Sequence, residues 1–402
     1  MRDLHHAPYP ASPLHAQRDP ASILSAMHTL RSLSLLGLST CVSLMLLAQE
    51  GSPWQIQPSG TTAGLRGIDA VSGTVAWASG TGGTVLRTTD GGAHWIKCAT
   101  PDATLDFRGV QGFDAQTAIV MASGPGAQSR LYKTTDGCTT WKLLFANPDA
   151  PNGFFDSFWF NGAHGMVIGD PVNGRFAVFF SDKDGKNWKR DPHPGLALGK
   201  RELAAFAASN SEIAIGNGLF TRGFATGGKS GSYFFSRPFM PNEEKTGLLE
   251  KAVRKEPPWK LSPIPVGAGT DSSGTFSVAY RYPVTTGVCA ECTFNDNSIF
   301  VAVGGDYKTP NDATKTAAWS SDGGATWIAA TTAPHGYRSA VQWSDALKDW
   351  IAVGPNGSDI SRDDGKTWNP LDDGNWNAIS LPFAVGPNGR IAKLNAAGPP
   401  KR

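Results

Sequence analysis

The chain has 402 residues, of which 40% are hydrophobic and 17% are charged, and this balance indicates a folded core and excludes a disordered protein. Lys and Arg number 36 against 34 Asp and Glu, so there is no global charge to attract nucleic acid or an anionic membrane. We therefore expect no nucleic-acid partner. The 47 glycines and 13 tryptophans favour a β-fold in which tight turns and aromatic anchors recur.

The N-terminal segment has the pattern of a secretory signal peptide. A basic start precedes an apolar run, Leu33–Ala48, that is too short for a membrane span. We expect residues 1–50 to form an N-terminal extension plus signal peptide, with translation starting at Met27 and cleavage near Ala48–Glu50. The protein is then exported, to the periplasm or out of the cell. Cys41 lies in the middle of the apolar run, so a lipid anchor is not expected.

Five segments of the chain follow the pattern Ser/Thr-x-Asp-x-Gly-x-x-Trp, three of them in full. Their acids and tryptophans are Asp90 and Trp95, Asp136 and Trp141, Asp184 and Trp188, Asp322 and Trp327, and Asp363 and Trp368. In the second copy Cys138 stands at the Gly position, and in the third Lys183 replaces the acid, which moves to Asp184. Asp accepts backbone N–H bonds and Gly adopts positive φ in turns, while Trp fills the gap between neighbouring sheets. We interpret these acids as structural turn residues.

Seven copies of a second unit also occur along the chain. Each combines a strand, a turn and a short apolar strand that ends in glycine. The paired strands are Leu65–Ala70 with Val75–Gly80, Phe107–Gly112 with Ala118–Gly124, Phe155–Phe160 with Gly165–Gly169, Ala205–Asn210 with Ile213–Gly216, Phe276–Tyr280 with Ile299–Gly304, Tyr337–Trp343 with Trp350–Gly354, and Trp376–Ser380 with Phe383–Gly386. Four strands per unit and a period of about 40–47 residues are typical of a propeller blade. The sequence therefore predicts an all-β, seven-bladed β-propeller over residues 51–396.

Two blades depart from the pattern. Blade four lacks the turn motif, and we expect Ser230–Ser236 as its third strand and Trp259 as its anchor, after an insertion at 238–258. The last unit lacks a fourth strand. Trp54–Gln57 can complete that blade and close the ring, which removes two free sheet edges. Residues 397–402 form a tail.

Four cysteines remain after the signal peptide, and export permits disulfides. Cys98 and Cys138 flank the tryptophans of adjacent repeats, so a bridge between them is expected. Cys289 and Cys292 fit a local disulfide or free thiols better than a redox or zinc half-site, because no further Cys or His partner is near. No phosphate loop, zinc motif or nucleophile elbow occurs, and we expect neither a metal nor a cofactor.

The repeated turn motif is the Asp-box, which is found in sialidases, some glucanases, sortilin-type receptors and the photosystem II stability/assembly factor family. Over residues 54–394 the chain most resembles this last family, a seven-bladed propeller behind an export signal with Arg-Gly-Ile/Val at the start of several blades. Gly304–Lys308 and Asp372–Asn377 are similar to uncharacterised bacterial BNR/Asp-box proteins. The resemblance implies an extracytoplasmic binding or assembly factor that holds a protein partner, such as a membrane complex, and does not by itself imply photosynthesis.

The first strand of each propeller blade lines the central channel, and the residues that start these strands form one face. These positions are Arg66, Arg108, Asp156, Ser277, Arg338 and Asn377, with Arg201 or Glu202 close to the place in blade four. Several arginines there predict a site for a protein or another acidic ligand, since Arg makes bidentate bonds to carboxylate or phosphate. The resemblance implies the same, because assembly-factor propellers carry an arginine patch. Equally, each Arg can pair with a neighbouring carbonyl or with Asp156.

A carbohydrate-active enzyme that uses the same face is the alternative. A glycoside hydrolase needs two opposed carboxylates. Asp156 is the one acid that the pattern places at the channel mouth, although Asp69 and Asp114 follow other first strands. A sialidase also needs an early Arg-Ile-Pro motif, which the sequence lacks. We therefore expect a non-catalytic, monomeric binding protein, with a glycan as the alternative ligand.

Overall fold

The chain forms two units, Met1–Gly51 and Ser52–Arg402. The computed structural model describes residues 52–216, 221–238, 257–267, 269–282 and 298–395, all within the second unit. The signal peptide and Cys41, most of the blade-four insertion, Cys289, Cys292 and the tail lie outside the described residues, so these predictions stay predictions. No helix in the described ranges has the length and hydropathy needed to cross a membrane.

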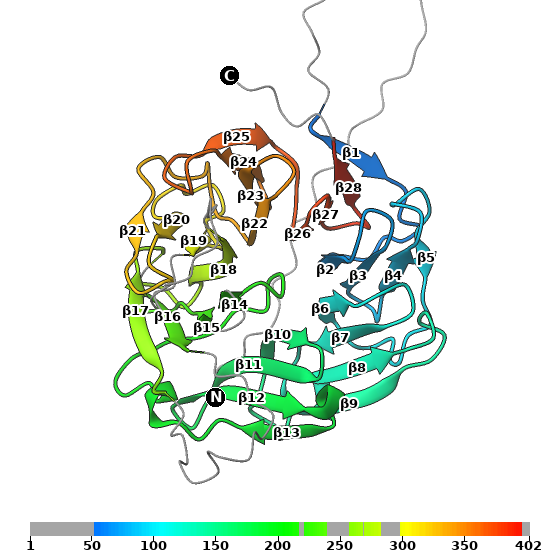
Figure 1. Ribbon diagram of the computed structural model, residues 1–402, viewed down its shortest axis with the longest axis horizontal. Helices are drawn as coiled ribbons and strands as arrows, with labels where there is room; N and C mark the ends of the chain where they lie inside the picture. Colours follow the sequence, from blue (N-terminus) through cyan, green and yellow to red (C-terminus); the bar gives the residue numbers. More distant parts are fainter. Residues whose placement is uncertain (1–51, 217–220, 239–256, 268, 283–297, 396–402) are drawn as a thin grey trace, which may run out of the picture. The chain divides into compact units, whose positions relative to one another are not determined.

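Seven four-stranded antiparallel sheets form a ring (Figure 1). Blade one contains β2 (Leu65–Ala70), β3 (Ala76–Gly80), β4 (Val85–Thr88) and β5 (Ile96–Lys97); blade two contains β6 (Phe107–Gly112), β7 (Ala118–Ala122), β8 (Arg130–Thr134) and β9 (Lys142–Ala146); blade three contains β10 (Phe155–Asn161), β11 (His164–Val172), β12 (Arg175–Asp182) and β13 (Asn187–Arg190). Blade four contains β14 (Ile213–Gly216), β15 (Thr221–Ala225), β16 (Ser232–Arg237) and β17 (Lys260–Ile264); blade five contains β18 (Ser273–Arg281), β19 (Ile299–Asp306), β20 (Ala317–Ser320) and β21 (Ile328–Ala329). Blade six contains β22 (Ala340–Ser344), β23 (Asp349–Gly354), β24 (Gly357–Ser361) and β25 (Asn369–Asp372), and blade seven contains β26 (Ala378–Ser380), β27 (Phe383–Val385), β28 (Ile391–Leu394) and β1 (Trp54–Gln57). The predicted seven-bladed propeller is confirmed.

The first strands of successive blades contact one another around the ring, from β2 through β6, β10, β14, β18 and β22 to β26 and back to β2. Seven hydrophobic clusters fill the seven spaces between adjacent blades. The middle strands are therefore buried on both faces, which explains why the run Ala-Ile-Val-Met-Ala of β7 is apolar throughout and fully buried.

The ring closes through the N-terminal strand, as predicted. β1 pairs antiparallel with β28, and Trp54 lies opposite Leu394 in this register. The resulting sheet order is β1-β28-β27-β26, so both ends of the described chain contribute to one blade. This pairing covers a sheet edge that would otherwise expose unpaired N–H and C=O groups.

A tryptophan at a corresponding place in each blade packs at each junction between blades. The seven are Trp95, Trp141, Trp188, Trp259, Trp327, Trp368 and Trp54, in the order of blades one to seven. Trp259 takes this place in blade four, where the turn motif is missing, and Trp54 takes it in blade seven. Each tryptophan lies between its own blade and the preceding one, so the repeated residue joins blades to each other.

The prediction for blade four was wrong in its strand order. Ile213–Gly216, which we expected as the second strand, is the innermost strand β14 and pairs with β15. Of the expected first strand, Ala205–Asn210, no residue lies in a named strand, although Ala204 just before it makes an isolated bridge to Gly227. The chain then leaves the sheet, and Asn210 adopts positive φ of 60°. The innermost strand is thus interrupted by a loop, which the alanine-rich sequence did not reveal.

Candidate partner-binding face

The predicted ligand residues share a structural position. Four innermost strands carry a register shift near their start, at the second residue of β2, β6 and β10 and at the fourth residue of β18. The residues left unpaired are Arg66 in β2, Arg108 in β6, Asp156 in β10 and Phe276 in β18. A β-bulge of this kind re-aims the extra side chain. Arg338 and Asn377 lie just before β22 and β26. The sequence pattern therefore identified a recurring feature of the backbone, although the side chains there behave differently.

Two of the predicted arginines form a partly exposed cationic pair in adjacent blades. Arg66 and Arg108 expose 35% and 22% of their side chains, and both approach Asp106. The Nε atom of Arg108 donates to Asp106 Oδ2 at 2.8 Å, and the Nε atom of Arg66 lies 3.7 Å from the same oxygen. Two guanidinium groups from adjacent blades thus approach one carboxylate.

Arg338 has a different role from the one predicted. Its side chain is completely buried, and its Nε atom donates to Asp359 Oδ2 at 2.5 Å. Asp359 also contacts His335, whose Nδ1 atom lies 2.8 Å from Oδ1. Asn356 accepts a further bond from the guanidinium at 2.5 Å. The guanidinium of Arg338 is enclosed by protein groups and does not reach solvent. Arg338 therefore joins strands of blade six and is not available to a ligand.

The remaining three predicted residues are not brought together with the arginine pair as ligand groups. Asn377 donates through Nδ2 to the carbonyl of Leu65 at 2.7 Å and so links blade seven to blade one. Arg201 is exposed, and its guanidinium lies over the ring of Tyr233 at 5.4 Å. Asp156 is only 2% exposed. It belongs to a buried group of acids described next.

Three carboxyl groups converge beneath the interrupted strand of blade four. Asp156 in β10, Asp170 in β11 and Glu212 interact electrostatically with one another. Burial raises the pKa of Asp170 to about 6. Burial also raises the pKa of Asp156 and Glu212 well above their usual range; the neighbouring acids add to the effect, and Arg108 opposes it at Asp156. Sequence analysis identified Asp156 but missed the other two, which come from a second strand and a loop.

An aromatic group that the sequence analysis also missed comes from blades four to six, whereas the arginine pair comes from blades one and two. Phe206 stacks on Phe276 with ring centroids 4.0 Å apart, and Phe276 also contacts Tyr307 and Tyr337 edge to face. Tyr307 is 46% exposed. The charge of Arg66 acts on the buried Tyr337, so the aromatic and cationic groups approach each other. Phe276 occupies the bulge position of β18, where we expected the next residue, Ser277, which instead pairs with Val303.

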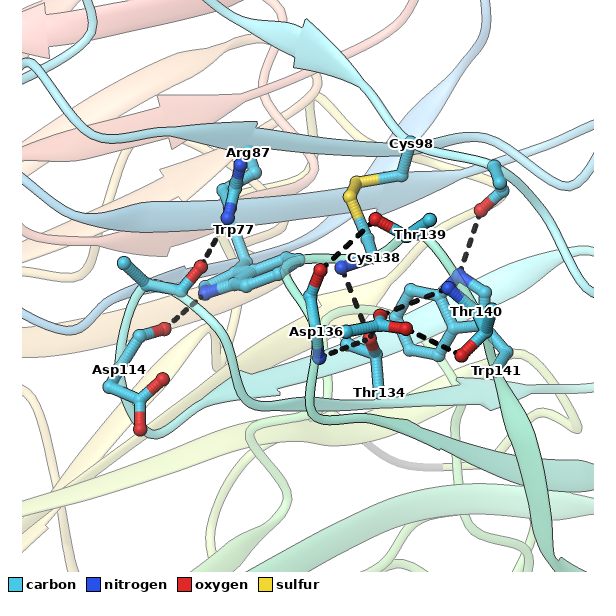
Figure 2. Close-up of a disulfide and its surroundings, with 12 residues drawn as sticks. Trp77, Arg87, Cys98, Asp114, Thr134, Asp136, Cys138, Thr139, Thr140 and Trp141 are labelled. Atoms are coloured by element: carbon cyan, nitrogen blue, oxygen red, sulfur yellow. Dashed lines mark hydrogen bonds between the residues drawn. A yellow bond between two sulfur atoms is a disulfide. The ribbon is translucent and has the colours of Figure 1, made fainter.

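The turns of the Ser/Thr-x-Asp-x-Gly-x-x-Trp motif connect the third and fourth strands, and they lie at the other end of the strands from the bulges. In blade two, Thr134 donates to Asp136 Oδ1 at 2.9 Å, while the N–H groups of Cys138 and Thr140 donate to Thr134 and Asp136 (Figure 2). The bonds from Thr140 lower the pKa of Asp136 to about 2. The copies in blades one, five and six make the same bonds. These acids are fully engaged in turn structure.

The copy in blade three is different. Its turn is a short 3-10 segment, Lys183–Gly185, in which the displaced acid Asp184 itself has a positive φ of 60°. Trp188 nevertheless stacks on Phe145 of blade two with ring centroids 4.5 Å apart. The tryptophan position is thus kept where the acid has moved.

A disulfide joins Cys98, which follows β5, to Cys138 in the turn between the third and fourth strands of blade two (Figure 2). The bridge connects two adjacent blades at the end of the strands opposite the arginine pair. Cys138 has φ of 71°, a left-handed conformation that favours Gly, and Gly is the residue expected at this place of the motif. The disulfide therefore replaces a glycine, which stands at this position in the motifs of blades one, five and six.

A groove of about 910 Å³ lies where the ring closes, and it bears on the alternative of a glycosidase. It is lined mainly by residues 56–62 and 387–390, with Lys97 and Asn375, and the lining contains no carboxylate. The three converging acids are instead packed beneath a loop. In the part of the chain that the structure describes, this open groove and this acid cluster do not coincide, whereas glycoside hydrolysis needs two carboxyl groups facing an open cleft.

Comparison with known proteins finds similarity to Ycf48 proteins. No family model matches the chain. A curated relative, photosystem II assembly lipoprotein Ycf48 of Synechococcus sp. (strain CC9902), is 27% identical over 174 residues, which cover 41% of this chain and 48% of the relative. The chain thus matches about half the length of that protein. The predicted resemblance to photosystem II assembly factors is confirmed.

Solved structures show the same fold. YCF48 from Cyanidioschyzon merolae superposes with a TM-score of 0.54 at 17% identity and covers 86% of this chain and 99% of its own. A structure described as YCF48 bound to D1 peptide superposes with a TM-score of 0.53 at 14% identity, over 86% of this chain and 97% of its own. At these identities the likeness concerns the propeller fold.

Proposed function

We propose that the protein is an exported, non-catalytic binding factor that holds an acidic segment of a protein partner on the face where the innermost strands begin. The observation that carries this proposal is the pair Arg66 and Arg108, which bulges in two adjacent blades aim at one place. A carboxylate of the ligand can take over guanidinium donors that Asp106 now shares between them. Tyr307, which is 46% exposed and contacts Phe276, supplies apolar contact area for another part of the segment.

The comparisons support a protein as the ligand. A neighbour in structure is described as bound to a D1 peptide, and a curated relative is described as an assembly lipoprotein. By analogy, we propose that an extended peptide of a membrane complex binds here. The disulfide between Cys98 and Cys138 supports export, because such bonds persist in oxidising compartments. A monomer suffices for this role, since the arginine pair lies within one chain.

A double charge reversal tests the proposal. The tagged chain over residues 51–402 is used to capture partners from extracytoplasmic and membrane extracts, with mass spectrometry as the readout, and the affinity for each captured protein is then measured. Arg66→Glu with Arg108→Glu should weaken the binding of the specific partner at least tenfold, because two attractive charges become repulsive, and tenfold corresponds to about 1.4 kcal/mol.

The matched control reverses two exposed cations on the outer strands, Lys142→Glu in β9 with Lys189→Glu in β13. This variant should bind like the wild type. The control variant should keep the wild-type melting temperature within a few degrees, because both of its side chains are exposed. Circular dichroism and thermal unfolding check that the Arg66/Arg108 variant is folded at the temperature of the binding measurement. Equal binding by the wild type and the Arg66/Arg108 variant would refute the proposed face. Binding of glycans, with loss of any protein partner, would favour the carbohydrate-active alternative.

A further inference from the structure

The loop that interrupts the innermost strand of blade four crosses the centre of the ring. The strand path begins at Ala204, which bridges to Gly227, and resumes at Glu212, whose carbonyl accepts the N–H of Ala225. Between these points Ala207–Ser211, which we call the plug, leaves the sheet beside β10 and β14 (Figure 1). A register shift in the other innermost strands displaces a single residue, whereas here five residues are displaced.

Polar contacts of the plug reach four other blades. They are Arg108 Nη1 to the carbonyl of Ala207 at 3.5 Å in blade two, the N–H of Phe158 to Asn210 Oδ1 at 2.8 Å in blade three, Ser211 Oγ to Ser277 Oγ at 2.7 Å in blade five, and Ser209 Oγ to the carbonyl of Ser339 at 2.8 Å in blade six. Contacts with blades on opposite sides of the ring require the plug to occupy its axis. The plug also bonds one of the two arginines of the proposed partner site.

The buried acids form the seat of this plug. Three successive backbone N–H groups, those of Ala205, Phe206 and Ala207, each donate to a different carboxyl group. Ala205 donates to Asp170 at 3.2 Å and Phe206 donates to Glu212 at 2.6 Å, while Ala207 donates to Asp156. The segment Ala205–Ala207, which leads into the plug, is therefore held by Asp156 of β10, Asp170 of β11 and Glu212, where the strand resumes.

The seat lacks compensation for its negative charge. Asp156 and Glu212 are buried, and in the described part of the chain Asp156 Oδ2 and Glu212 Oε2 have no hydrogen-bond partner. Burying an ionised carboxylate without a partner is costly, and such groups bind a proton instead. The charged or titratable groups facing the seat are Arg108 from β6, which acts on Asp156, and Tyr337 from the start of blade six, which interacts with Glu212. One guanidinium cannot neutralise three carboxylates.

We propose that the plug is a proton-dependent device: protons on the Asp156, Asp170 and Glu212 seat hold it in the axis of the ring, and their loss releases it from Arg108. The raised pKa values fix the direction, because a carboxyl group whose pKa is higher in the seated state favours seating at low pH. The free energy by which protonation stabilises the seated plug is fully present below the ordinary pKa of the acids. It is lost as the pH rises through about 6, the pKa of Asp170. The regulatory consequence for partner binding rests on the proposed function; the motion of the plug does not.

Hydrogen exchange of the chain over residues 51–402, measured from pH 5 to pH 8 without any partner, tests the device. After correction for intrinsic exchange rates, peptides covering 204–212 should lose protection by about tenfold between pH 5 and pH 8, since the pKa of about 6 for Asp170 lies about one unit above the lower limit of this range. Peptides from β7 should keep their protection throughout. Equal plug protection at both pH values would overturn the proposal.

Two variants locate the effect in the seat. Glu212→Gln keeps an oxygen for the N–H of Phe206 and adds amide donors for Asp156, so its plug should stay protected at pH 8. Asp170→Asn should show the same trend and serves if the first variant does not fold. The control is Asp69→Asn, because Asp69 is another acid whose burial raises its pKa to about 6, and it bonds Gly112 away from the seat. Wild-type pH dependence in both seat variants, or its loss in the control alone, would refute the assignment.

Discussion

Three arginines, Arg66, Arg108 and Arg338, hold the same position in their repeats but have different surroundings. The acid that each one contacts determines whether its side chain is exposed or buried. Arg66 and Arg108 share the partly exposed Asp106, whereas Arg338 is enclosed with its own carboxylate, Asp359. Position in the repeat predicts where each side chain starts. It does not predict the acid that meets it, because Asp359 comes from β24, two strands away.

Arg338→Met should lower the free energy of unfolding by about 3–5 kcal/mol, because it leaves Asp359 buried without its partner. Arg66→Met, at a partly exposed position, should cost less than about 1 kcal/mol. Urea unfolding of both variants checks this difference. Similar stabilities for the two would show that Arg338 is not a structural residue.

At the scale of single elements, the strands between turn motifs could be predicted well. Asp, Gly and Trp recur at fixed spacing because each blade needs the same turn and the same anchor. The plug could not be predicted, since Leu203–Ala208 is an apolar segment that suits a strand as well as a buried loop. The seat was missed for a related reason, because its acids are brought together only when that loop crosses the ring.

Trp54→Ala tests the element that closes the ring. Trp54 is 2% exposed, and its Nε1 atom donates to Ser358 of blade six at 3.0 Å. Removal of the indole should cost about 3–5 kcal/mol, as for other large core aromatics. Thermal unfolding should show a clear loss, and Trp54→Phe should recover part of it. A loss below about 1 kcal/mol would mean that β1 contributes little to closure.

At the scale of the whole molecule, stability depends on how firmly adjacent blades are joined. Most junctions rely on apolar packing, and the junction of blades one and two adds the disulfide, which links residues 40 apart in sequence. Chain-entropy estimates give about 4 kcal/mol for a loop of this size.

Cys98→Ser with Cys138→Ser should therefore lower the free energy of unfolding by about 2–4 kcal/mol. Urea unfolding with and without reductant measures the effect. The wild type should shift toward the variant when reduced, and the variant should not respond. An unchanged midpoint in the variant would show that packing alone secures this junction.

Ring closure also sets the order in which the molecule can form. Asn395 donates to the carbonyl of Ser52, 343 residues earlier in the chain, and the strand pairing beside it spans a similar distance. Ribosomes release the early strand first, so β1 waits without its partner until the last blade is made, and closing so long a loop costs about 5 kcal/mol of chain entropy. Blades one and two, whose cysteines are only 40 residues apart, can be locked covalently long before that. The N-terminal part of the protein can thus fold first, through blades one and two, yet its strand β1 is the last to find its partner.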